Sequence, residues 1–105
     1  MTLNELIEQE TGYIPFTTFA DDFAIAERFG AYAIKDTFKR AFKGWKDNVK
    51  YFTELVMVLN WKIWQHYNRN EAVAKVYNEC YESAMQYADE NLKDEDAHYF
   101  YTTLD

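Results

Sequence analysis

Two residues near the carboxyl end of the chain have the spacing of metal ligands. Glu95 and His98 stand three positions apart, which is the Glu-x-x-His spacing that di-iron helical bundles use for two ligands on one helix face. Such a site needs a second motif of the same kind and further carboxylates from other helices. The other histidine, His66, has Ile63 at that spacing. We therefore expect no metal site and interpret this segment as a solvated acidic helix start.

The single cysteine is the next candidate for chemistry. Cys80 with His66 or His98 could form a nucleophile and its base, but Cys80 falls on the apolar stripe of its helix, where buried thiols are unreactive. The chain shows no serine elbow, no glycine-rich phosphate loop and no zinc spacing. Paired carboxylates such as Asp21 and Asp22 lie near helix ends, where the helix dipole explains them. The sequence thus predicts no catalytic residue, no cofactor and no enzymatic activity.

Charged residues are sorted by segment along the chain. Residues 1–30 carry a net charge of −5, residues 31–69 a net charge of +5, and residues 70–105 a net charge of −7. Asymmetry of this kind bears on partners and encounter rather than on fold. It favours a binding protein over an enzyme.

The acidic segment after residue 70 supplies the candidate partner-binding surface. Apolar residues recur at helical spacing over 71–92, with carboxylates on the opposite side. Carboxylates at regular spacing can take the place of phosphates in a basic groove. A short helix from residue 94 cannot turn three consecutive aromatic residues inward, so at least one is expected to be exposed as an interface anchor. The candidate contacts are Glu79, Glu82, Asp89, Glu90, Asp94, Glu95 and Asp96, with Tyr99 and Tyr101 as aromatic anchors.

The basic middle segment predicts a lysine stripe on a helix over residues 31–47. Its lysines fall in an arc of about 80° beside the apolar side of the helix, and Lys50 joins them only if the helix continues through Gly44 and Asp47. The stripe could contact phosphates, could be an ordinary solvated side, or could dock on acidic helices of this chain or of a second copy. Because four or five charges flanked by acidic segments bind phosphates weakly, we do not expect direct nucleic-acid binding. The members are Lys35, Lys39, Lys43 and Lys46.

Composition and periodicity predict an all-α fold. Three Gly and one Pro in 105 residues leave few helix breakers, and 19% aromatic residues argue against disorder. Residues 3–10 are expected to form a short helix. The segment 48–67 is apolar on nearly every side and is expected to be the buried central helix, with Trp45, Trp61 and Trp64 mostly in the core. We predict one domain over residues 1–105, a single compact bundle of four to five helices.

The cellular compartment can also be inferred from the sequence. A single cysteine excludes an intrachain disulfide and fits a reducing compartment. The acidic start of the chain lacks a signal-peptide pattern, and the longest apolar run, Leu55–Leu59, is far too short to span a membrane. The expectation is a cytoplasmic protein without membrane contact.

Three stretches of the chain resemble one family of proteins. They are Phe19–Gly30, Ala33–Phe38 and Glu54–Gln65, and the family consists of small acidic helical proteins from phages and mobile elements of gut bacteria. The likeness covers most of the chain but brings no catalytic motif and no residue roles. It implies action inside a bacterial host cell. Proteins of this kind resemble, in size and charge, the anti-CRISPR and other anti-defence inhibitors that bind a nuclease and block its nucleic-acid groove.

The sequence and this resemblance together predict a non-enzymatic inhibitor of the anti-CRISPR kind. Its partner is expected to be a protein, such as a CRISPR effector nuclease or another nucleic-acid enzyme with a basic groove. Two alternatives stay open: a self-associating assembly module, in which the lysines meet the acidic helix of a second copy, and a weak nucleic-acid-binding module that uses Lys35–Lys50. The same features also fit an adaptor for a host factor.

Overall fold

The computed structural model describes residues 16–104, with side chains described from residue 20 onward. Within this range the chain forms helices only, joined by short turns, so the predicted all-α bundle is confirmed. The short helix expected over residues 3–10 lies outside the described residues. The helices are α2 (Phe16–Glu27), α3 (Ala31–Trp45), α4 (Val49–His66), α5 (Glu71–Asn91) and α6 (Asp94–Leu104).

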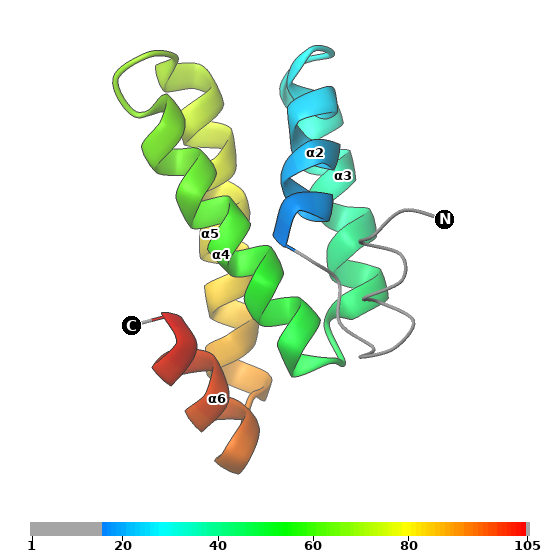
Figure 1. Cartoon of the computed structure of the whole chain (residues 1–105), viewed down its shortest axis with the longest axis vertical. Helices are drawn as coiled ribbons and strands as arrows, with labels where there is room; N and C mark the ends of the chain where they lie inside the picture. Colours follow the sequence, from blue (N-terminus) through cyan, green and yellow to red (C-terminus); the bar gives the residue numbers. More distant parts are fainter. Residues whose placement is uncertain (1–15, 105) are drawn as a thin grey trace.

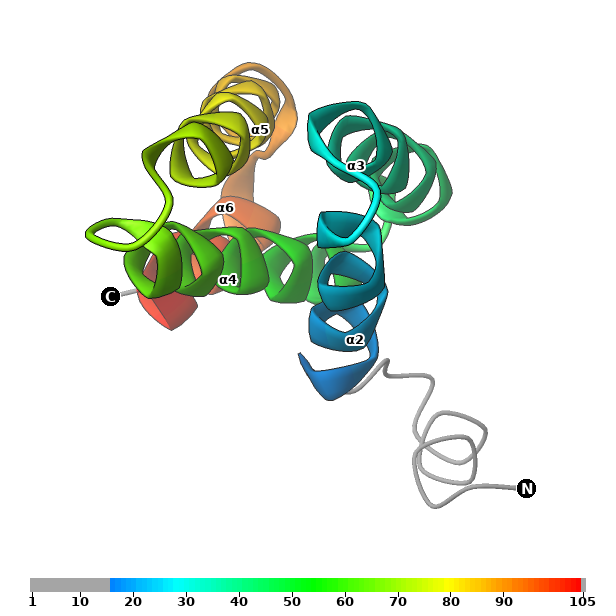
Figure 2. The same ribbon diagram turned by 90° about the horizontal axis from the view of Figure 1, so that it is seen from above.

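Two antiparallel helix pairs form the body of the molecule. The first pair is α2 with α3 and the second is α4 with α5, and the turns of both pairs lie at the same end (Figure 1). At the other end, α6 packs against α4. Seen from above, α3 and α5 lie side by side over α4, while α2 covers the flank of α4 (Figure 2). The two helices with the most strongly sorted charges, α3 and α5, are therefore neighbours.

Local sequence signals place the turns. Gly30 precedes α3 with a φ of 102°, a conformation open to glycine and strained for other residues. Asn48 opens α4, and its Oδ1 accepts hydrogen bonds from the backbone N–H groups of Lys50 at 3.1 Å and Tyr51 at 3.3 Å. Asn70 caps α5 in the same way through the N–H of Val73 at 3.2 Å. These caps satisfy the first amides of each helix and fix where the helix pairs reverse.

Aromatic rings make up much of the core. Phe52 of α4 stacks on Phe100 of α6 with ring centroids 5.3 Å apart, which holds the last helix on the central one. Phe23 of α2 meets Tyr77 of α5 edge to face at 5.5 Å. All four side chains are fully buried. Edge-to-face and stacked rings add attraction beyond the area they bury, so these contacts tie distant helices together.

The central helix α4 contacts every other described helix, but it is not buried on all sides. Trp61 is 44% exposed and Trp64 is 71% exposed, so the expectation that these tryptophans lie mostly in the core is wrong for both. They lie on the side of α4 that faces a groove lined also by Thr103 and Leu104 of α6. Trp45 is half-buried against Tyr51, with ring centroids 4.4 Å apart.

Candidate functional site

The outer side of α5 carries a row of exposed carboxylates, and the first turn of α6, which follows in the chain, carries more. On a helical wheel the five carboxylates of α5 fall in an arc of about 100°, and Lys75 is the only basic residue of that helix. The first turn of α6 adds three more carboxylates. All eight are exposed. We call this set the acidic face: Glu71, Glu79, Glu82, Asp89, Glu90, Asp94, Glu95 and Asp96.

Weak local contacts hold two of these carboxylates in place. Glu82 accepts a hydrogen bond from Asn78 at 3.1 Å, and Glu90 accepts one from Gln86 at 3.2 Å. Both donors are one turn earlier on the same exposed side of α5. Such contacts order the carboxylates without neutralising them. The arc therefore stays a surface of negative charge.

The aromatic candidates on α6 differ in their surroundings. Tyr101 is 38% exposed, and its hydroxyl donates a hydrogen bond to the carboxylate of Asp89. That hydrogen bond raises the pKa of Tyr101 above its ordinary value, with smaller contributions from burial and from the charge of Asp89. Phe100 is buried and Tyr99 is half-buried. Tyr101 is thus the aromatic residue that lies at the edge of the acidic face, and it joins α6 to α5.

The predicted lysine stripe lies along α3, directly beside α5. Lys35, Lys39 and Lys43 are exposed and Lys46 is half-buried; we call these four residues the lysine rim. The Nζ of Lys35 lies 3.2 Å from Oε2 of Glu79. A shallow groove of about 300 Å³ between the two helices is lined by Lys35, Lys39 and Glu79 together with Cys80. The structure therefore brings the basic and acidic candidates together on one side of the molecule.

A second surface is aromatic rather than charged. Trp64 is 71% exposed and Tyr67 is 60% exposed, at the end of α4 and in the turn that follows. A groove of about 340 Å³ runs between Trp61, Trp64 and the end of α6 at Leu104. Large exposed aromatic side chains are typical of binding surfaces. Sequence reasoning missed this surface because it placed both tryptophans in the core.

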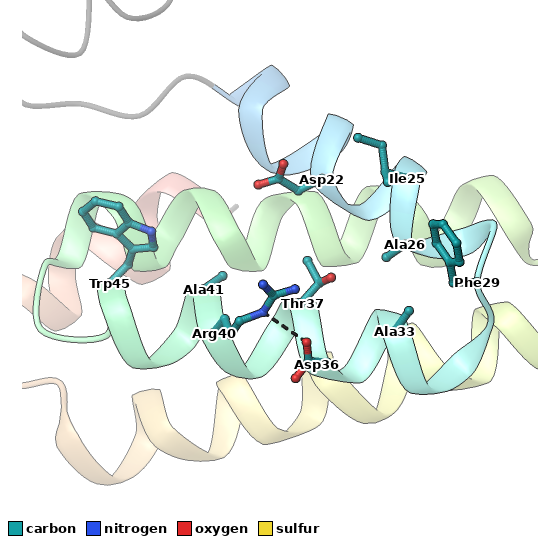
Figure 3. Close-up of a pocket in the computed structure, with 10 residues that line it drawn as sticks. All are labelled: Asp22, Ile25, Ala26, Phe29, Ala33, Asp36, Thr37, Arg40, Ala41 and Trp45. Atoms are coloured by element: carbon teal, nitrogen blue, oxygen red, sulfur yellow. Dashed lines mark ion pairs between the residues drawn. The ribbon is translucent and has the colours of Figure 1, made fainter.

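A wider groove lies between α2 and α3, on the side away from α5 (Figure 3). It holds about 520 Å³, with exposed Ile25 and Phe29 at one end and Trp45 at the other. At its edge the Nε of Arg40 pairs with Asp36 at 3.1 Å. Burial, followed by the charge of the adjacent acid Asp21, raises the pKa of Asp22 on the opposite side of the groove. These features make an amphipathic groove without a reactive group.

A buried polar cluster ties α2 to α4 and α5. Three groups meet at Oε1 of Glu27: the hydroxyl of Tyr77 at 2.7 Å, Nε2 of His66 at 2.8 Å and Nζ of Lys62 at 3.3 Å. Lys62 is only 2% exposed. Sequence reasoning missed this cluster, although a lysine within the apolar run of α4, one turn before His66, was a signal for it.

The cysteine considered for catalysis lies in the core. Cys80 is 4% exposed, and burial raises its pKa to about 11, so little thiolate exists at neutral pH. Among residues 16–104 no three His, Cys, Asp or Glu side chains are placed to hold a metal ion. Within the same range no helix is long and apolar enough to cross a membrane.

Comparison with known proteins adds no relative. No family model matches the chain, and neither a curated protein nor a solved structure matches it.

Proposed function

We propose that the protein is a non-enzymatic inhibitor whose acidic face occupies the basic nucleic-acid-binding groove of a partner nuclease. The observation that supports this proposal is the acidic face: eight exposed carboxylates lie between residues 71 and 96 on two consecutive helices. Charge of one sign on one surface steers a partner of the opposite sign and favours its encounter.

The dimensions of α5 fit such a groove. Its 21 residues make a rigid rod of about 31 Å at 1.5 Å per residue. Roughly nine base pairs of a duplex cover the same length at about 3.4 Å per step. A groove that accepts nucleic acid over this distance can therefore accept the carboxylates of α5 in place of phosphates.

Tyr101 adds an anchor to the charge. Its ring is partly exposed, and its hydroxyl is held by Asp89 at the junction of α5 and α6. Asp94 lies about two turns earlier on the same side of α6. An aromatic side chain with a fixed orientation, surrounded by carboxylates, can supply the apolar contact that charges alone do not give.

The arrangement of the lysine rim speaks against direct binding of nucleic acid. Lys35 is paired with Glu79, and the whole rim runs beside the acidic face. Phosphates that approach the lysines also approach these carboxylates and are repelled by them. The geometry supports a protein partner over a nucleic-acid partner.

The proposal can be tested by inhibition of purified nucleases, with RNA-guided nucleases included in the set. DNA cleavage and displacement of fluorescent DNA are measured for the wild type and for Glu82→Lys/Glu90→Lys. The matched control is Asp21→Lys/Asp47→Lys, which makes the same change of net charge at exposed carboxylates of α2 and of the turn after α3. We expect the wild type and the control to inhibit and the α5 variant to lose inhibition.

Two results would contradict the proposal. If no nuclease in the set is inhibited, the protein is not an inhibitor of this kind. If the α5 variant inhibits as well as the control does, the acidic face is not the docking surface.

A further inference from the structure

The lysine rim and the acidic face run in parallel at matched heights. Two contacts fix this register: Lys35 pairs with Glu79 at 3.2 Å, and the rings of Phe42 and Tyr87 meet with centroids 5.0 Å apart. Since α3 and α5 run in the same direction (Figure 1), each rim residue is level with a residue about 44 positions later. Lys39 is thus level with the residue after Glu82.

The positive charge of lysines further along the rim is accessible to a partner. Within residues 20–104, Lys35 is the member of the rim that forms an ion pair, whereas Lys39 and Lys43 are exposed and make none. Tyr32 lies on the same side of α3, since it precedes Lys39 by seven positions. Its side chain is 84% exposed. This side of the molecule therefore carries positive charge, negative charge and one exposed aromatic ring.

The two stripes make the surface complementary to itself. Consider two copies stacked on this surface, related by a two-fold axis that runs parallel to α3 and α5. The rotation exchanges left and right but keeps height, so the lysine rim of each copy faces α5 of the other at the matching level. A two-fold axis perpendicular to the helices, within the same plane, would instead place lysine on lysine. Symmetric dimers use self-complementary surfaces of this kind.

We propose that this surface binds a second copy of the chain, in a two-fold dimer that pairs α3 of each copy with α5 of the other. Lys39 and Lys43 of one copy approach Glu82 and Glu90 of the other, and Tyr32 supplies the apolar contact at one end. Each of these interactions occurs twice. The inference goes beyond the proposed inhibition, and the two uses share Glu82 and Glu90, so the dimer hides the carboxylates that a partner would contact.

The physical character of the dimer follows from its contacts. Exposed ion pairs are individually weak, and each copy carries a net charge of −7 that opposes association. Salt screens the pairs over distances of about 10 Å at 0.1 M. We therefore expect a weak dimer that forms at low ionic strength and dissociates as salt is added.

Analytical ultracentrifugation of the full chain tests the dimer. At about 100 µM protein we expect a dimer in roughly 20 mM NaCl and a monomer in roughly 500 mM NaCl. Lys39→Glu/Lys43→Glu and Glu82→Lys/Glu90→Lys are each expected to be monomeric at low salt, because like charges then face each other. The matched control Lys50→Glu/Arg69→Glu changes exposed residues that belong to neither α3 nor α5 and is expected to dimerise.

Mixing the two charge variants gives the decisive result. The lysines of Glu82→Lys/Glu90→Lys then face the carboxylates of Lys39→Glu/Lys43→Glu, so an equimolar mixture is expected to form a heterodimer at low salt. A wild type that stays monomeric under these conditions overturns the proposal, as does a mixture that fails to associate. Neither result decides whether the protein inhibits a nuclease. Lys39→Glu/Lys43→Glu leaves the acidic face unchanged, so inhibition by the acidic face can be tested with this variant whether or not the protein dimerises.

Discussion

Glu27 and Lys62 form an ion pair, 3.3 Å from Oε1 to Nζ, in which the lysine is almost completely buried. The pair joins α2 to α4, and Tyr77 extends it to α5 by donating a hydrogen bond to the same oxygen. Together with the exposed ion pair of Lys35 and Glu79, it holds the α2–α3 pair on the α4–α5 pair, in addition to the apolar packing of rings such as Phe23. Removing Glu27 leaves the ammonium group of Lys62, whose side chain is almost completely buried, without a counter-charge.

The first prediction concerns the loss of this pair. Glu27→Gln is expected to lower the free energy of unfolding by about 3 kcal/mol, because the ammonium group of Lys62 stays buried without a counter-charge. Glu79→Gln breaks the exposed pair with Lys35 and should cost no more than about 1 kcal/mol. Urea denaturation followed by circular dichroism measures both. Equal effects of the two substitutions would show that the cluster adds little to stability.

The second prediction is the acid response of the same cluster. Burial alone raises the pKa of Glu27, but hydrogen bonds from Tyr77 and His66 and the charge of Lys62 outweigh it, so the pKa lies below 4.5. A carboxylate with a lowered pKa contributes stability that is complete above the unfolded value and is lost as pH falls through the folded value. Stability is therefore expected to fall below about pH 4.5. In Glu27→Gln the part of this loss of stability that comes from Glu27 should be absent. Urea denaturation of the wild type and the variant between pH 6 and pH 3 measures the free energies of unfolding that test this.

The third prediction concerns Glu54, which behaves in the opposite way. Its side chain is buried in α4, its Oε2 has no hydrogen-bond partner among the residues that the structure describes, and burial raises its pKa. A raised carboxyl pKa lowers stability at neutral pH, and the penalty disappears as pH falls through the folded value towards the unfolded one. Glu54→Gln is expected to raise the free energy of unfolding at pH 7 by about 1 kcal/mol. The gain should shrink near pH 4.5, and Glu82→Gln on the surface should show no gain at either pH.

Much of the fold followed from sequence patterns. The helical spacing of apolar residues depends on residues close together in the chain, and it placed the helices from α3 to α6 correctly to within a few residues. Gly30 separates α2 from α3 for the same local reason. The polar cluster depends on groups up to 50 positions apart, such as Glu27 and Tyr77. No spacing in the sequence indicates which helices meet.

The exposure of Trp61 and Trp64 likewise depends on packing that sequence patterns do not give. An apolar stretch predicts a buried helix, but how much of it is covered depends on the number and length of its neighbours. Among the described residues, Leu104 of α6 lines a groove with Trp61 and Trp64, and both indole rings stay exposed. The side of α3 that carries Lys39 could likewise be drawn on a wheel, whereas its position beside Glu79 needed the packing of α3 on α5. The carboxylates on the outer side of α5 could be predicted from the sequence, but the position of the α3 lysines beside them could not.

The fourth prediction is that Cys80 reacts only when the structure opens. The thiol is 4% exposed, and burial raises its pKa to about 11. A reagent therefore reaches it rarely, and little of it is in the reactive thiolate form. Alkylation by iodoacetamide at pH 8 is expected to be at least about 100-fold slower than in urea. The control is Cys80→Ala with Ala72→Cys, which places a thiol at an exposed position of the same helix. Comparable rates at the two positions would contradict the buried site.

The fifth prediction separates the core of α4 from its open side. Phe52 is fully buried against Phe100, so Phe52→Ala is expected to lower the free energy of unfolding by about 3–5 kcal/mol. Trp64 is 71% exposed, so Trp64→Ala should change it by less than about 0.5 kcal/mol. Urea denaturation of the two variants gives both numbers. A large loss for Trp64→Ala would contradict this assignment, because it would mean that the ring of Trp64 is covered in solution.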